Sequence, residues 1–186
     1  MRSSPIRLLL LLLVLAFGPD LASAASVLQL DVPAHVADST AVVEAIVQTA
    51  EESVDPATGR PVTDTTVTVT AVLAGAAPER LAVRQHKGTA GELTYGIPGD
   101  GNLVEGARVV LFLHQAEGQW WLTALGQSVW TVKGSGDDAA VSQDLDGLAF
   151  FTLDVETGAF LPTEPTPGPR TLGALRAAVK AAGEGR

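Results

Sequence analysis

The sequence predicts a mainly β protein, a small and partly open antiparallel β-barrel that is followed by a C-terminal α-helix. Threonine and aliphatic residues alternate over Thr66–Leu73, which is the period-two pattern of a half-buried strand. Val109–Leu113 is apolar on both faces and favours a central strand. Turn-forming residues, 19 glycines and 11 prolines, separate these segments. A β-sandwich is the alternative architecture.

Residues 1–24 are predicted to be a signal peptide. Arg2 and Arg7 precede or flank Leu8–Phe17, an apolar run of signal-peptide length that is too short to cross a bilayer. The small residues of Ala22-Ser23-Ala24 predict cleavage after Ala24. We therefore expect a secreted or periplasmic protein without a membrane span after cleavage, with an uncleaved anchor as the alternative.

The rest of the chain is predicted to comprise a β-barrel domain over 25–158, a proline-rich linker over 159–170 and a helix over 171–183. The domain begins with a helical turn within 28–38, which Asp31 caps. A long hairpin follows, because Asp55–Gly59 is dense in turn formers. In its second strand we expect the threonines to face water and four aliphatic residues to face the core: Val67, Val69, Ala71 and Leu73.

In the next strand, Leu81 and Val83 are expected to face inward and Arg84 and His86 outward. Gly88–Gly106 is rich in glycine and predicts a long loop with a short strand over 93–97. Long loops within compact domains are often functional. Further strands are expected at 108–114, 119–125, 128–132, 139–143 and 148–154, with a bulge or sharp bend at Gly126.

The C-terminal segment changes in composition. Four prolines between 161 and 169 predict an extended linker. Thr171 is placed to cap the following helix, in which Leu172, Leu175 and Val179 recur at helical spacing. This apolar face is narrow, so the helix either docks on the barrel or is marginally stable.

Charge and composition exclude several functions. The formal net charge of −9 disfavours nucleic acid and anionic membranes as partners, because the surface repels phosphate groups. The chain has no cysteine, which rules out disulfides, thiol nucleophiles and cysteine-type zinc sites.

The sequence predicts no catalytic residue, no cofactor and no metal ligand. No serine lies in a G-x-S-x-G motif, and His35, His86 and His114 are too far apart to form a short metal-binding motif. His114 is expected at the end of a strand. One calcium question stays open: four acidic residues gather in a predicted loop region but lack the full calcium-loop pattern, namely Asp137, Asp138, Asp144 and Asp146.

Aromatic residues are the predicted contacts for a partner. Trp120 and Trp121 are neighbours in a predicted strand, so they point to opposite faces and one of them faces outward if the other faces the core. Tyr95 lies in the glycine-rich loop. The predicted contact residues are therefore Trp120, Trp121 and Tyr95.

About half of the chain carries an ordered set of short motifs: Asp55–Gly59, Thr66–Val69 with Val72–Gly75, Leu81–Gln85, Glu105–Leu113 and Leu125–Gln127. With these motifs, the segment 41–133 resembles a group of bacterial exported β-barrel proteins of uncharacterised function, some of which occur beside or fused to matrixin-type metalloproteases. The resemblance implies a barrel of the OB or netrin shape and implies no catalytic residues. Inhibition of a metalloprotease through an N-terminal cysteine does not carry over, because this chain has no cysteine.

These observations predict an exported, non-enzymatic β-barrel module that binds an exported protein or polymer and acts with a secreted protease. One alternative is a secreted hydrolase with carboxylates or His114 in the mouth of the barrel. Another is an envelope structural or interaction protein that docks through its proline-rich tail and terminal helix.

Overall fold

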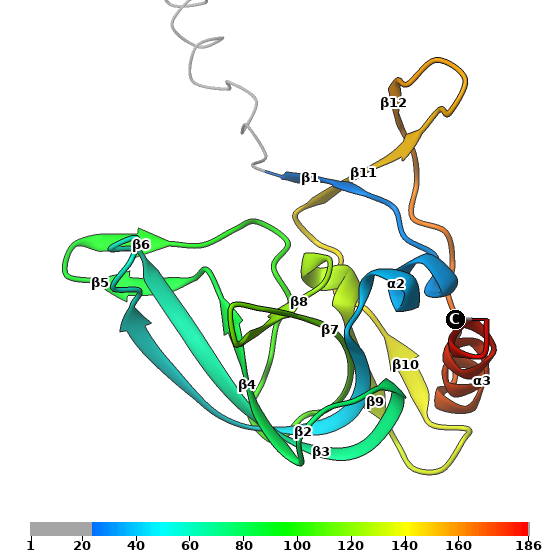
Figure 1. Ribbon diagram of the computed structural model, residues 1–186, viewed down its shortest axis with the longest axis horizontal. Helices are drawn as coiled ribbons and strands as arrows, with labels where there is room; N and C mark the ends of the chain where they lie inside the picture. Colours follow the sequence, from blue (N-terminus) through cyan, green and yellow to red (C-terminus); the bar gives the residue numbers. More distant parts are fainter. Residues whose placement is uncertain (1–23, 186) are drawn as a thin grey trace, which may run out of the picture.

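The computed structural model describes residues 24–185 of the 186-residue chain. The predicted signal peptide lies outside the described residues apart from Ala24, at which the predicted cleavage occurs. The described chain is mainly β with a C-terminal helix, as the sequence predicts (Figure 1).

A near-closed sheet forms the centre of the molecule. Its strands follow the order β10-β9-β7-β2-β3-β4-β8, and an additional pairing between β7 and β8 closes five of them into a ring of hydrogen bonds. The ring contains one parallel pair, β4 with β8. This closure agrees with the predicted partly open barrel. The strands are β2 (Ala41–Val54), β3 (Pro61–Gly75), β4 (Arg80–Gln85), β7 (Arg108–Ala116), β8 (Gln119–Leu122), β9 (Val129–Lys133) and β10 (Ala140–Ser142).

The predicted long hairpin is the pair β2–β3. Its turn is held by the Asp55 carboxylate, which accepts a hydrogen bond from the backbone nitrogen of Ala57 at 2.8 Å. Gly59 completes the turn with a φ of 68°, a conformation that glycine adopts without strain. Three register shifts interrupt the β2–β3 pairing. Such bulges bend and twist a strand, which allows β2 to curve around the ring.

Two hydrophobic cores lie on opposite faces of β2 and β7. The first fills the ring and includes Val43, Leu111 and Trp120. The second includes Phe112 and Trp130 and is covered by two helices, α2 (Val32–Asp38) and α3 (Leu172–Gly183). These strands are therefore buried on both faces, as the apolar run in β7 predicts.

Helix α3 is docked rather than free. Thr171 caps it by accepting a hydrogen bond from the nitrogen of Ala174. Leu172, Leu175 and Val179 are completely buried in the second core. The narrow apolar face is sufficient because α2 and the outer face of the sheet cover it. Asp31 caps α2 in the same way, as predicted.

Inward and outward positions in β3 follow the prediction only in part. Val67 is completely buried. Further along the strand Val69 is only partly buried against the first core, and Leu73 packs against the second core instead. The register shift between Glu44 and Ala45, where Thr70 is the additional residue of β3, accounts for this change of face.

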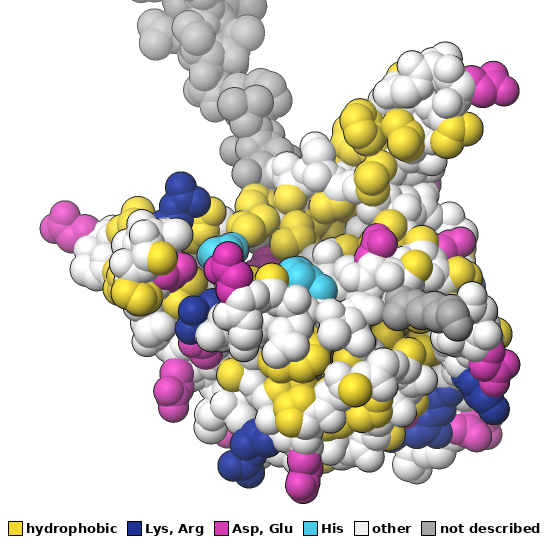
Figure 2. All heavy atoms as spheres, viewed as in Figure 1, with side chains coloured by type: hydrophobic (Ala, Val, Ile, Leu, Met, Phe, Trp, Pro, Cys, Tyr) yellow, Lys and Arg dark blue, Asp and Glu magenta, His cyan; other side chains and the backbone are white. Residues whose placement is uncertain are grey.

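A three-stranded sheet projects from the ring as an arm. It consists of β1 (Ala25–Leu28), β11 (Leu148–Leu153) and β12 (Phe160–Pro162), with β1 parallel to β11. Apolar side chains are exposed on it, including Val155 and Phe160 at 87% and 61%, and they gather over the arm in Figure 2. The pairing of β1 with a strand more than a hundred residues away has no signal in the local sequence pattern.

Two further predictions are refined. The glycine-rich segment contains a small hairpin, β5 (Gly88–Ala90) with β6 (Leu93–Tyr95). Gly126 lies in a 3₁₀ turn, η1 (Leu125–Ser128), between β8 and β9. Within residues 24–185, no helix has both the length and the apolar character that are needed to cross a membrane.

Candidate functional site

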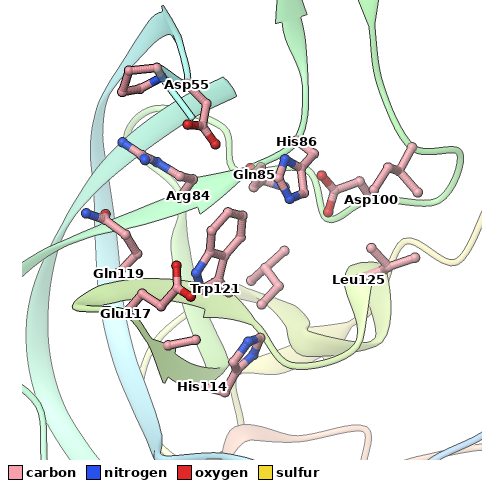
Figure 3. Close-up of a pocket in the computed structure, with 14 residues that line it drawn as sticks. Asp55, Arg84, Gln85, His86, Asp100, His114, Glu117, Gln119, Trp121 and Leu125 are labelled. Carbon is pink, nitrogen blue, oxygen red and sulfur yellow. The ribbon is translucent and has the colours of Figure 1, made fainter. Parts of the chain in front are cut away.

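A cleft of about 620 Å³ lies against the outer face of the ring, where the ends of β4, β7 and β8 meet. It is enclosed by the β2–β3 turn, the end of β4, the loop before β7, the β7–β8 turn, β8 and η1. We call it the mouth cleft, and Figure 3 shows its side chains. The volume is within the range of small-molecule sites. Its principal polar and aromatic residues are Asp55, Arg84, Gln85, His86, Asp100, His114, Glu117, Gln119 and Trp121.

The two adjacent tryptophans of β8 have different environments. Trp120 is 9% exposed and packs in the ring core, which leaves little of it for a partner. Trp121 is half-buried and lies at the centre of the mouth cleft (Figure 3). The predicted alternation is therefore present. Trp121 also contacts the ring of His86, with the centroids 4.8 Å apart and an interplanar angle of 36°.

Tyr95, the third predicted contact residue, does not line the mouth cleft. It lies in β6, where the guanidinium carbon of Arg60 is 5.6 Å from the centre of its ring. The structure thus does not bring the three predicted aromatic contacts together, and only Trp121 belongs to this site.

Several polar groups of the mouth cleft have no partner within the described part of the chain. The side chains of His114, Glu117 and Gln119 make no hydrogen bond or ion pair with described residues, and neither does the indole nitrogen of Trp121. Arg84 differs, because it forms a two-pronged ion pair with Asp64 at 2.7 and 2.6 Å. The unpaired groups are free to bond a ligand.

Backbone strain also concentrates here. Among residues 24–185, the non-glycine residues with positive φ are Glu117 at 51° and Leu125 at 50°. Both line the mouth cleft. Glu117 and Gly118 form the two-residue turn between β7 and β8, where asparagine followed by glycine is the favoured pair. Strained positions of this kind cluster at functional sites.

Asp100 contributes a carboxyl group with a perturbed pKa. Burial raises the pKa of Asp100 above its usual range, although Gln85 and the charges of Lys87 and His86 act in the opposite direction. Its Oδ1 accepts a hydrogen bond from the nitrogen of Gly101 at 2.9 Å. Figure 3 shows the carboxylate directed toward His86. A carboxyl group in this environment holds its proton at a higher pH than an exposed one.

Gln85 anchors this side of the cleft. It is 2% exposed and donates from Nε2 to the carbonyl of Gly101 at 2.7 Å. Its Oε1 is buried and has no hydrogen-bond partner among the described residues. Gln85, Asp100 and Glu117 were not among the site residues predicted from the sequence. Gln85 could have been identified because it is a polar residue at an inward position of a strand. No local feature of the sequence distinguishes Asp100 or Glu117.

The predicted histidines occupy two environments. His86 and His114 both line the mouth cleft, although they are far apart in sequence. His35 is 3% exposed, stacks on Phe112 and lies 3.0 Å from the Oγ of Ser128 through Nε2. Burial lowers the pKa of His35 to about 4. Ser128 is completely buried, so this pair holds α2 against η1 and cannot meet a substrate.

The four acidic residues that were considered as calcium ligands do not share a common contact. Asp137 forms an ion pair with Arg176 at 2.6 Å. The carboxylate of Asp144 accepts a hydrogen bond from the backbone nitrogen of Asp146 at 3.3 Å, which is typical of a turn. Asp138 lies before β10. In residues 24–185, no group of three or more histidine or acidic side chains is arranged to hold a metal ion.

Comparisons with protein-family models, with curated proteins and with solved structures return no match for this chain. The resemblance to exported barrels associated with matrixin-type proteases therefore remains a prediction from the sequence motifs.

Proposed function

We propose that this chain is an exported, non-enzymatic module that binds an exported protein or polymer in the mouth cleft, in association with a secreted protease. The observation that carries the proposal is the position of Trp121, half-buried at the centre of a cleft in which the side chains of His114, Glu117 and Gln119 make no hydrogen bond with described residues. An aromatic anchor surrounded by available hydrogen-bonding groups is typical of a binding site.

The charge of the site restricts the partner. Asp55, Asp100 and Glu117 line the cleft, and the positive charge of Arg84 is matched by Asp64. The chain as a whole carries a formal charge of −9. An anionic polymer such as nucleic acid is repelled both at long range and within the cleft.

Partner capture tests this proposal. The purified protein, immobilised, is incubated with the exported fraction of its source cells, and bound proteins and sugars are identified. Trp121→Ala should abolish capture, whereas Phe160→Ala, a truncation of an exposed aromatic on the arm, should leave it unchanged. Circular dichroism confirms that both variants fold. Capture that survives Trp121→Ala but is lost with Phe160→Ala would move the binding site to the arm.

A second candidate function is hydrolysis in the same cleft. Asp100, whose pKa is raised by burial, and Glu117, a carboxylate without a partner, provide two carboxyl groups in different environments. Such a pair is the arrangement that separates a general acid from a base or nucleophile. If the protein turns over a polymer substrate and Asp100→Asn abolishes that turnover, hydrolysis would replace binding as the proposed function. Ser128 is completely buried and cannot account for such turnover.

The third alternative, an envelope protein that docks through its terminal helix, finds less support. The apolar residues that would contact a partner, Leu172, Leu175 and Val179, are completely buried within the chain. Within the proline-rich segment, Gly168 lies against the ring of Trp130, whereas most of the segment is exposed.

A further inference from the structure

We infer that the ligand of the mouth cleft is a neutral saccharide chain. This inference rests on the proposed binding function and names the chemical class of its partner. It follows from the combination of one aromatic surface, several unpaired hydrogen-bonding groups and an excess of negative charge in a single cleft.

The aromatic surface is the indole of Trp121. A sugar ring presents C–H groups on one face and hydroxyl groups around its edge, so it packs on a flat aromatic ring while its hydroxyls point outward. Figure 3 shows Trp121 with His86 and Asp100 on one side and Glu117 and Gln119 on the other. Asp100, Glu117 and Gln119 therefore lie around the platform, where the hydroxyls of a stacked sugar would be, while His86 contacts the indole ring itself.

The unpaired groups offer both donors and acceptors. The Trp121 indole N–H donates, the Glu117 carboxylate accepts, and the Gln119 amide does both. None of these groups has a hydrogen-bond partner within the described chain. A hydroxyl group donates and accepts at the same time, so a saccharide is the ligand class that satisfies all of them together.

The charges distinguish neutral sugars from charged ones. Asp55, Asp100 and Glu117 would repel a uronate or a phosphorylated sugar. Arg84, the cation in the cleft, is already bonded twice to Asp64. Arg84 is therefore not available to bind the acidic group of a charged sugar.

A basic peptide is the competing ligand, because a lysine or arginine side chain would also meet Trp121 and Glu117. The cationic group of such a side chain, however, carries no acceptor for the N–H groups of Trp121 and Gln119, whereas a sugar hydroxyl does. These features favour the uncharged ligand.

The experiment titrates the purified protein with neutral hexasaccharides of glucose, xylose and N-acetylglucosamine in different linkages. The comparison probes are oligogalacturonate and a decalysine peptide. Tryptophan fluorescence and calorimetry follow binding. At least one neutral probe should give saturable binding, which Trp121→Ala should weaken at least about tenfold and Trp121→Phe should largely retain. Glu117→Gln should also weaken it, while Phe160→Ala should not.

The outcomes separate this inference from the proposed function. Binding of decalysine in the cleft with no binding of any neutral saccharide overturns the saccharide class and leaves the binding module intact. Saccharide binding that Trp121→Ala does not affect also overturns it. Absence of binding by every probe, together with partner capture unaffected by Trp121→Ala, overturns both. Release of new sugar ends during the titration supports the saccharide class and overturns the non-enzymatic function.

Discussion

The mouth cleft and the cluster around Glu44 differ in whether their glutamate side chains are paired with arginine. Glu44 lies in β2, is 2% exposed, and bonds Arg176 at 2.6 and 3.0 Å and Arg108 at 2.9 Å. Arg176 also pairs with Asp137 at 2.6 Å. In the mouth cleft, Glu117 has no partner in the described chain.

The difference separates groups that hold the fold from groups that are available to a ligand. Burial by itself raises the pKa of Glu44, but hydrogen bonds from Arg176 and Arg108 and their charges outweigh it, so the pKa is lowered. The cluster thus joins β2, β7 and α3 with a paired charge. Removing an arginine partner of Glu44 leaves a buried charge without compensation, whereas substituting Glu117 breaks no hydrogen bond.

The largest expected effect comes from breaking the Glu44 cluster. Arg108→Met with Arg176→Met should lower the free energy of unfolding by about 3–5 kcal/mol, because Glu44 stays buried without a partner. Urea denaturation measures this. Arg84→Met, which breaks the more exposed pair with Asp64, should cost about 1 kcal/mol or less. Adding Glu44→Leu to the double variant should recover most of the loss, and a failure to do so would show that the arginines act through packing.

The adjacent tryptophans should differ just as clearly. Trp120→Ala empties part of the ring core and should cost about 3–5 kcal/mol, because a large buried side chain is lost. Trp121→Ala should cost much less and affect binding instead. Thermal denaturation compares the two variants, and equal losses would show that Trp121 is part of the core rather than of the site.

The buried His35 should make the stability of the fold depend on pH. The folded-state pKa of His35 is about 4 and its ordinary value is 6.5, so the unfolded chain binds the proton more readily. Stability should be fully present above pH 6.5 and fall by about 3 kcal/mol as the pH decreases to about 4.

Denaturation at several pH values, with His35→Gln as the comparison, isolates this contribution from that of the carboxylates. The variant should lose the additional slope between these pH values. Identical slopes for the unmodified protein and His35→Gln would contradict the assignment of this pH dependence to His35.

The smallest expected effect on stability has the opposite sign. Glu117→Asn places a favoured residue at a turn position with a φ of 51° and should stabilise the fold by about 0.5–1 kcal/mol. It should also weaken ligand binding several-fold, because the carboxylate is lost from the cleft. A destabilised variant with unchanged binding would show that Glu117 serves the turn and not the site.

Local patterns in the sequence determined most of the elements. The alternation in β3, the apolar run of β7, the turn after Asp55 and the capped helix α3 all appear in the structure near their predicted positions. Each depends on residues that are close in the chain, through side-chain period, turn chemistry or capping. The opposite orientation of Trp120 and Trp121 follows from the same rule.

Only the tertiary structure decided how these elements meet. The β7–β8 pairing closes the ring, and the parallel pairing of β4 with β8 brings Trp121 beside His86. Glu44 bonds arginines that are 64 and 132 residues away. Closure and pairing over such distances depend on the packing of the whole chain, and no periodicity in a short window records them. For the same reason the sequence indicated an outward-facing tryptophan but not the Glu117, Gln119 and Asp100 that surround it.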